Sequence, residues 1–306
     1  MASRSRRRGV GRREILLSGA TALLGVGVVG SGITRWWEDG ASGTSAALVP
    51  PPTPPTPTPD YQGIARSKIE KYLRDAGDRV TVAVRDQVTG LELTVGKRRF
   101  QTASIVKVDI LAALLLHRQE QGKSLTSYER NLARPMIVLS DNNATTSLYQ
   151  TIGYRAGLTE ANKTLGLKET KPNASWGMTT TTAADQLRLL KTITDPDGPL
   201  TEASRKYLLG LMGDVDEAQD WGITAAAGED ATASYVKNGW DTIDIDNGLW
   251  QVNSIGRIIE PDRDWLIAVL SDHHASQEKG IKLVERVAKY TLNQLRPIPA
   301  PEDQTH

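Results

Sequence analysis

Two kinds of periodicity divide the chain after residue 60. Alternation of apolar and polar residues predicts two strands at 79–87 and 91–96, joined by a turn at 88–90. The same alternation returns near the carboxyl end and predicts three more strands, at 233–240, 248–259 and 264–272. Between these two groups apolar residues recur every three or four positions, which is typical of helices that bury one face.

Helices are predicted before, between and after the strands. They cover residues 61–76, 104–119, 130–139, 144–149, 157–164, 182–193, 202–211 and 276–295. One sheet can use all five strands if the terminal helices cover one face and the helical block covers the other. The sequence therefore predicts an α+β fold: a five-stranded antiparallel sheet flanked by terminal helices, with an all-helical lobe inserted between strands two and three and a cleft between the lobes.

The first 34 residues have the pattern of an export signal or a membrane anchor. Residues 1–13 hold six arginines and no acid, and residues 15–34 carry no charge. Arg12 and Arg13, followed by an apolar run, resemble the twin-arginine export signal. The run is long enough to span a bilayer, so cleavage and retention as an anchor both remain open. We expect an extracytoplasmic protein, secreted or tethered to the outer face of the cytoplasmic membrane.

A proline-rich segment separates this signal from the folded part. Seven prolines occur between Pro50 and Pro59, and polyproline geometry makes such a segment a stiff spacer of roughly 30 Å. The expected organisation is a signal or anchor at 1–34, a linker at 35–60, one catalytic domain at 61–297 and a tail at 298–306.

Charge and cysteine content exclude several classes of protein. The net charge is only +1, so no nucleic-acid-binding domain is indicated. The chain has no cysteine, which excludes disulfides and a lipoprotein anchor. We expect a monomer that contacts a membrane only through its N-terminal segment.

The apolar stretch TASIVKVDIL, where the helix at 104–119 begins, holds two polar residues of chemical interest. Ser104 and Lys107 are three positions apart, so their side chains share one face of a helix. Alternatively, Ser104 is an ordinary helix cap and Lys107 is a solvated charge. Ser276 and Lys279 have the same spacing, so the pair alone does not indicate a function.

Two further motifs follow Ser104-x-x-Lys107 in order. S-D-N at residues 140–142 lies between two predicted helices, and K-N-G at residues 237–239 lies on the first strand after the helical block. The three motifs resemble the S-x-x-K, S-D-N and K-T-G motifs of the penicillin-recognising serine enzymes. The order of elements around them, over about residues 61–297, resembles the class A β-lactamases.

This resemblance implies a catalytic group of four residues. Ser104 is the nucleophile, and because no histidine is well placed, Lys107 removes its proton. A lysine acts as a base only when it is partly neutral, which burial and the nearby cation Lys237 favour. Ser140 lies between the two lysines and relays a proton to the leaving nitrogen.

The resemblance also implies residues that bind the substrate. Asn142 contacts the acyl side chain, and Asn238 together with Lys237 attracts the substrate carboxylate. The backbone N–H groups of Ser104 and Trp240 stabilise the oxyanion, and the indole of Trp240 is expected to reshape the cleft. The predicted binding set is Asn142, Asn238, Gly239 and Trp240, and no metal or other cofactor is expected.

The sequence departs from the class A pattern at two places. K-N-G replaces K-T-G, so Asn238 lacks the hydroxyl that meets the carboxylate, although its amide could donate instead. Class A enzymes also carry a glutamate in an E-x-x-L-N loop that activates the hydrolytic water. Glu169 and Asn173 keep that spacing, but Glu169 comes early and the loop lacks the usual clamping Arg and Asp. A solvated acid is the alternative reading of Glu169.

Three functions follow from these observations and remain open. The first is an exported serine hydrolase of the class A β-lactamase kind, acylated at Ser104 by β-lactams or related amides and then hydrolysed. The second is a penicillin-binding-like peptidase that acts on D-alanine-terminated peptides and releases the acyl group slowly. The third is a non-catalytic protein that keeps the fold and binds the cell wall.

Overall fold

The computed structural model describes residues 59–77, 79–243 and 247–299. The predicted export signal and nearly all of the proline-rich linker, as well as the tail from residue 300, lie outside the described residues. Their predicted roles therefore stay predictions. Among the described residues, no helix combines the length and the apolar character needed to cross a membrane.

The predicted five-stranded antiparallel sheet is confirmed. Its strands are β1 (Val80–Asp86), β2 (Glu92–Val95), β5 (Ala233–Ile243), β6 (Leu249–Glu260) and β7 (Arg263–His274). They lie in the order β2-β1-β7-β6-β5, and every neighbouring pair is antiparallel. Strand β5, which carries the K-N-G motif, is therefore at an edge of the sheet, with one side of its backbone left unpaired by other strands of that sheet.

A second, two-stranded sheet was not predicted. It pairs β3 (Phe100–Gln101) with β4 (Thr180–Thr181), each only two residues long. Such short strands show no alternation along the sequence, so no periodicity could indicate them. This small sheet joins the segment before Ser104 to the end of the loop that follows residue 168.

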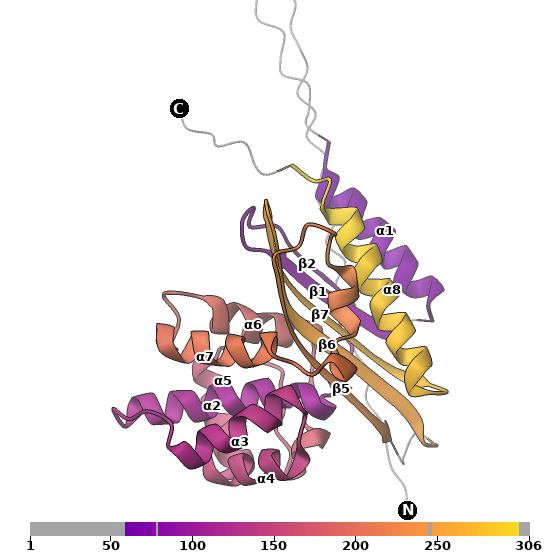
Figure 1. Ribbon diagram of the computed structural model, residues 1–306. Helices are drawn as coiled ribbons and strands as arrows, with labels where there is room; N and C mark the ends of the chain where they lie inside the picture. The colour runs from indigo at the N-terminus through magenta and orange to yellow at the C-terminus, as the bar shows by residue number, and fades with distance from the viewer. Residues whose placement is uncertain (1–58, 78, 244–246, 300–306) are drawn as a thin grey trace, which may run out of the picture. The chain divides into compact units, whose positions relative to one another are not determined.

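The terminal helices α1 (Tyr61–Asp75) and α8 (Gln277–Leu295) lie side by side on one face of the sheet (Figure 1). Tyr72 of α1 stacks on Tyr290 of α8 with 4.1 Å between ring centroids. The helical lobe packs on the other face, as predicted. Its helices are α2 (Val106–Glu120), α3 (Ser127–Val138), α4 (Asn142–Thr151), α5 (Tyr154–Thr164), α6 (Ala183–Thr194) and α7 (Glu202–Gly213).

Alternate residues of strand β7 contribute to hydrophobic cores on opposite faces of the sheet. Its residues Leu266, Ala268 and Leu270 belong to the core shared with the helical lobe, while the alternate residues belong to the core under α1 and α8. All these side chains are buried. The period of two along a strand thus divides the molecule into two hydrophobic cores, one on each face.

Helix α2 is the central element of the lobe and lacks a polar stripe. Every residue from 106 to 116 is buried, because α3, α4, α5 and α7 all contact it. A helix that is apolar on all sides is typical of such a central position. Lys107 is carried into this interior at the first turn of the helix.

Candidate active site

Ser104 lies in a short 3-10 helix, η1 (Ala103–Ile105), directly before α2. Ala103 adopts a left-handed backbone conformation with φ of +46°, which is unfavourable for a residue with a Cβ and is often found at functional sites. Ser104 is not the N-cap of η1 or of α2. By contrast, Ser276 caps α8 by accepting a hydrogen bond from the backbone N–H of Lys279. The two S-x-x-K sequences therefore have different structural roles.

Gly239 of β5 brings the K-N-G motif against the backbone of Ser104. A Cβ on Gly239 would lie only 2.7 Å from the Ser104 nitrogen and 2.8 Å from the Thr102 carbonyl oxygen. No real side chain fits at such distances, so only glycine allows the strand to come this close. The predicted meeting of the first and third motifs is therefore observed at the level of the backbone.

Lys107 is fully buried, and oxygen atoms surround its amine. Its Nζ donates to the Ser140 carbonyl oxygen at 2.7 Å, the Ser140 Oγ at 3.0 Å and the Asn142 Oδ1 at 2.8 Å. The alternative prediction of a solvated surface charge is wrong. The S-D-N motif thus lies around the amine of the S-x-x-K motif.

Lys237 approaches the same hydroxyl from the sheet. Its Nζ lies 3.1 Å from the Ser140 Oγ and 3.0 Å from the Asn238 carbonyl oxygen, and the side chain is fully buried. Ser140 Oγ is therefore within hydrogen-bond distance of both amines. In the described part of the chain, no carboxylate forms an ion pair with either lysine.

Burial without a carboxylate partner lowers the pKa of both lysines. Burial of Lys107 lowers its pKa to about 7, and the more distant charge of Asp141 opposes this shift only in part. Burial and then the positive charge of Lys107 lower the pKa of Lys237 well below its ordinary value. An amine that is neutral in part near pH 7 can accept a proton.

The S-D-N turn is held in an unusual conformation. Ser140 has φ of +58°, and Asp141 caps α4 by accepting a hydrogen bond from the Ala144 N–H at 2.7 Å. This cap fixes the start of α4, so that Asn142 and the Ser140 hydroxyl both face Lys107. Asp141 is thus a helix cap, and this cap positions the other two residues of the motif.

The predicted role of the Asn238 amide is wrong. The side chain is buried, and its Nδ2 donates to the carbonyl oxygens of Gln219 at 2.8 Å and Trp221 at 2.9 Å. Both amide hydrogens are used within the protein, so neither is left for a substrate carboxylate. Asn238 instead ties β5 to the segment between α7 and the 3-10 helix η4 (Gly222–Ala226).

Trp240 also differs from its prediction. Side chains alternate along β5, and the indole of Trp240 packs against Trp221 and the core under the terminal helices, with 5.6 Å between ring centroids. The indole therefore does not lie on the face that carries Lys237 and Gly239, and it does not reshape the site as expected. Its backbone N–H remains the predicted second oxyanion donor.

Among the described residues, the Glu169 carboxylate forms no hydrogen bond with the group around Ser140. Its Oε2 accepts a hydrogen bond from the Thr182 hydroxyl at 2.9 Å, at the start of α6. Asp185 holds the adjoining backbone by accepting from the N–H groups of residues 168–170. Asp185, in the first turn of α6, thus supplies a clamp that the sequence analysis did not identify.

Trp176 is the site residue that the sequence reasoning missed. The Lys107 Nζ lies 4.9 Å from the centroid of its indole. The indole belongs to the short helix η2 (Trp176–Met178) and donates from its Nε1 to the Thr146 Oγ1 at 3.2 Å. No motif contains a tryptophan at this position, and an isolated aromatic residue in a polar loop gives no periodicity that could have indicated it.

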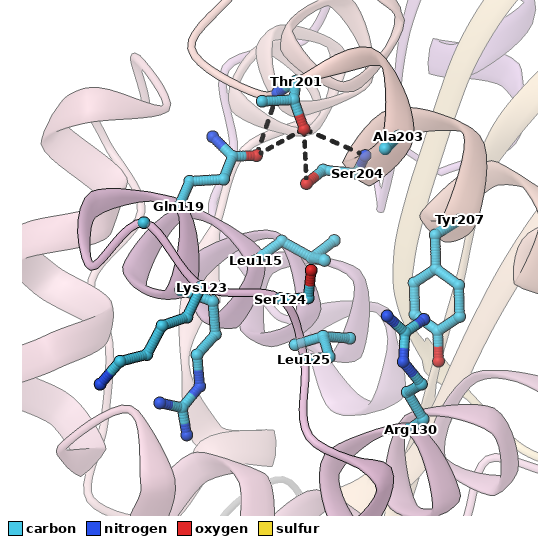
Figure 2. Close-up of a pocket in the computed structure, with 12 residues that line it drawn as sticks. Leu115, Gln119, Lys123, Ser124, Leu125, Arg130, Thr201, Ala203, Ser204 and Tyr207 are labelled. Carbon is cyan, nitrogen blue, oxygen red and sulfur yellow. Dashed lines mark hydrogen bonds between the residues drawn. The ribbon is translucent and has the colours of Figure 1, made fainter.

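A cavity of about 390 Å³ lies at the other end of α2, and no predicted site residue lines it (Figure 2). Arg130 lies over the Tyr207 ring at 5.5 Å, and Thr201 accepts a hydrogen bond from the Ser204 N–H at one edge. The cavity is thus separate from the group around Ser140.

Comparisons with solved structures support the fold. The TLA-1 extended-spectrum β-lactamase is 21% identical, with a TM-score of 0.66, over 76% of this chain and 99% of that one. PBP-A is 20% identical, with a TM-score of 0.66, over 76% and 97%. A β-lactamase from Chitinophaga pinensis is 20% identical, with a TM-score of 0.64, over 76% and 99%. At these identities the likeness shows the fold alone.

The match to a family model is more direct. No curated protein matches the sequence. The model of the Beta-lactamase enzyme family, however, matches residues 116–295, which is more than half of the chain. This match, together with the fold and the three motifs gathered around Ser140, establishes that the chain belongs to the Beta-lactamase enzyme family.

Proposed function

We propose that the protein is a serine enzyme that β-lactams acylate at Ser104 and that releases the acyl group slowly. The observation that carries this proposal is the meeting of two fully buried amines, those of Lys107 and Lys237, at the Ser140 hydroxyl, 3.0 and 3.1 Å away. Burying two amines without a carboxylate destabilises a protein, so a purely structural role does not account for it. Family membership supports a serine hydrolase of this type.

The proposed acylation step uses these groups as follows. The neutral amine of Lys107 accepts the hydroxyl proton of Ser104, and the Ser104 oxygen attacks the carbonyl carbon of the lactam amide. The N–H groups of Ser104 and Trp240 donate to the oxygen that becomes negative. As the C–N bond breaks, the Ser140 hydroxyl gives its proton to the nitrogen and receives one from the Lys107 ammonium.

Lys237 contributes positive charge to the same step. β-Lactams carry a carboxylate next to the lactam nitrogen, and a carboxylate bound beside Lys237 favours the ammonium form of this lysine, which attracts it. Because Asn238 donates both of its amide hydrogens inside the protein, this attraction depends on Lys237 more than the K-N-G sequence suggests. Because Lys107 and Lys237 both contact the Ser140 hydroxyl, their titrations are coupled, and a proton is assigned to the three residues together and not to one of them.

Slow release of the acyl group follows from what surrounds Lys107. Hydrolysis of the ester needs a base that activates water, and Glu169, the sequence candidate, instead accepts a hydrogen bond from Thr182. Trp176 lies over the Lys107 amine. A PBP-A variant has been described as an acyl-enzyme complex with penicillin G, and the fold of that protein is similar. We therefore place the protein closer to a penicillin-binding enzyme than to a rapid β-lactamase.

A D-alanine-terminated peptide is the second candidate substrate. The same acylation step applies to it, because such a peptide presents a carbonyl followed by an amide nitrogen and a terminal carboxylate. Because Glu169 accepts a hydrogen bond from Thr182, slow deacylation is expected, and this favours the peptide over rapid turnover of antibiotics. Export to the cell surface, as the N-terminal sequence predicts, is part of the proposal, because cell-wall peptides are found there.

The test is intact-mass analysis of the protein incubated with benzylpenicillin. We expect an adduct with the mass of the whole antibiotic, lasting minutes to hours, that is absent from Ser104→Ala. Rapid product accumulation without a lasting adduct would instead indicate an efficient β-lactamase. If neither adduct nor product formed, the protein would be a non-catalytic member of the family.

A further inference from the structure

The amine of Lys107 forms three hydrogen bonds and also lies over an aromatic ring. The acceptor oxygens belong to Ser140 and Asn142, at 2.7 to 3.0 Å. The ring is the indole of Trp176, whose centroid lies 4.9 Å from the nitrogen. At this distance the ring face attracts an ammonium but provides no negative charge and no atom that can accept a proton.

The indole is fixed in this position from two sides. Its Nε1 donates to the Thr146 hydroxyl, one turn beyond Asn142 on α4, and its ring packs against the core of the helical lobe. A partly buried indole with its N–H bonded is well oriented. Trp176 is therefore tied to the same helix that carries Asn142.

The loop that carries Trp176 is joined to the segment before the nucleophile. Lys171 and Thr180 pair through two backbone hydrogen bonds of 2.8 and 3.1 Å, which close the loop. Thr102, two residues before Ser104, donates its N–H to the Thr179 carbonyl oxygen at 2.7 Å. Helix η2 also contacts η1 directly. The indole, the base and the nucleophile thus form one connected unit.

We infer that Trp176 is a positioning residue that holds the Lys107 amine toward Ser140 and Asn142 and keeps water and water-activating groups away from that side of the acyl-enzyme. This inference rests on the proposed function. The ring occupies a side of the amine from which a carboxylate or a water molecule could otherwise approach. An acyl ester next to this side is consequently protected, because a closed apolar wall suppresses hydrolysis of reactive intermediates.

The same contact affects proton transfer. A ring face stabilises the ammonium form of Lys107, so its removal makes the neutral form more favourable while the site stays buried. In Trp176→Leu, which keeps an apolar side chain, the midpoint of the acylation rate against pH should fall by about 0.5 to 1 pH unit. Trp176→Phe retains a ring and should keep the midpoint close to that of the native protein.

The test combines this pH profile with the lifetime of the penicilloyl adduct. Native protein, Trp176→Leu and Trp176→Phe are incubated with benzylpenicillin from pH 5.5 to 9, and intact mass gives the rate of adduct formation. After excess antibiotic is removed, the decay of the adduct is followed. We expect Trp176→Leu to lose its adduct several-fold faster and Trp176→Phe to resemble the native protein. Trp250→Leu, a change of another half-buried tryptophan that lies on β6, is the matched control.

Each outcome decides a separate question. If the native protein forms no adduct, the proposed function fails, and this inference fails with it. If the native protein forms an adduct but Trp176→Leu has the same pH midpoint and the same adduct lifetime, only the inference is overturned. If Trp250→Leu changes both quantities as much as Trp176→Leu does, the effect is general to tryptophan loss, and the inference is also overturned. Circular dichroism at each pH checks that the variants remain folded.

Discussion

The two ends of α2 differ in how a cation is paired: a fully buried lysine lies at the first turn and a half-buried arginine at the last. At the first turn the amine of Lys107 has no carboxylate partner, and burial lowers its pKa to about 7. Asp109, the acid in that turn, lies two positions away, on a different face of the helix. At the last turn the Arg118 guanidinium forms three hydrogen bonds with the Glu129 carboxylate.

The partner of Arg118 is itself held by its own helix. Burial alone would raise the pKa of Glu129, but hydrogen bonds from Arg118 and Thr126 hold that pKa below its ordinary value. Glu129 and Thr126 also form a capping box at the start of α3. The cation in the last turn of α2 is thus paired with a carboxylate and stabilises the fold, whereas the amine in the first turn has no such partner. The comparison teaches that the lysine amine can act as a base because no carboxylate pairs with it, whereas the paired end carries an arginine, which stays charged.

Removing the unpaired amine should have the largest effect. We expect Lys107→Met to lower the acylation rate by about 10³-fold, because a general base is lost. The protein should stay folded, since the methionine fills a similar buried space. Stopped-flow mixing with a chromogenic cephalosporin measures the rate. Lys279→Met, in the S-x-x-K sequence that only caps α8, is the matched control, and an equal loss there would refute the comparison.

Breaking the ion pair between Arg118 and Glu129 should lower the stability of the protein and leave the acylation rate unchanged. Glu129→Gln leaves the half-buried Arg118 guanidinium without its carboxylate partner, which we expect to lower the free energy of unfolding by about 2 kcal/mol. Urea denaturation measures this change. The acylation rate at 25 °C should match that of the native protein. A stable variant with slow acylation would show that the two ends do not act separately.

Placing a carboxylate beside Lys107 should give the first turn of α2 an ion pair like that of Arg118 in the last turn. Asn142→Asp places a carboxylate where Oδ1 now lies, 2.8 Å from the amine. An adjacent opposite charge raises the pKa of the lysine by about 1 to 2 units, so acylation at pH 7 should slow by about tenfold or more. The rate should recover in part near pH 9. Asn143→Asp, at the exposed neighbouring position, should have no such pH dependence.

The smallest expected effect is the pH dependence of stability. The pKa of Lys107 is about 7 in the folded protein and 10.5 as the ordinary value, so the unfolded chain binds more protons between these pH values. Stability therefore rises with pH in this window, by about 1 kcal/mol between pH 7 and 8 from this group. Urea denaturation of the native protein and Lys107→Met at both pH values isolates the contribution. Parallel changes in the two proteins would contradict the lowered pKa.

The sequence predicted the fold well because the fold depends on periodicity. Alternation located the five strands, and the order of elements placed the helical lobe between strands two and three. The site was predicted less evenly. Ser104, Lys107, Ser140 and Lys237 were named from the motifs, and the structure brings the two lysines together at Ser140.

The errors arose where a side chain had two alternative partners. Asn238 could reach a ligand or a backbone carbonyl, and Glu169 could reach water or the Thr182 hydroxyl. Tertiary packing determines which of these hydrogen bonds forms, and the spacing of residues along the sequence does not reveal it. Trp176 could not be found for a related reason, because its contact with Lys107 joins segments about 70 residues apart.

The close approach of Gly239 to Ser104 also affects the folding of the chain. The two residues are about 135 positions apart, and β5 reaches the edge of the sheet only through its pairing with β6. The nucleophile is therefore assembled late, by contacts with high loop-closure entropy. During synthesis, a chain that ends before β6 lacks the surface on which β5 docks. Such a nascent chain is expected to be inert toward β-lactams even though it already contains Ser104, Lys107 and Ser140.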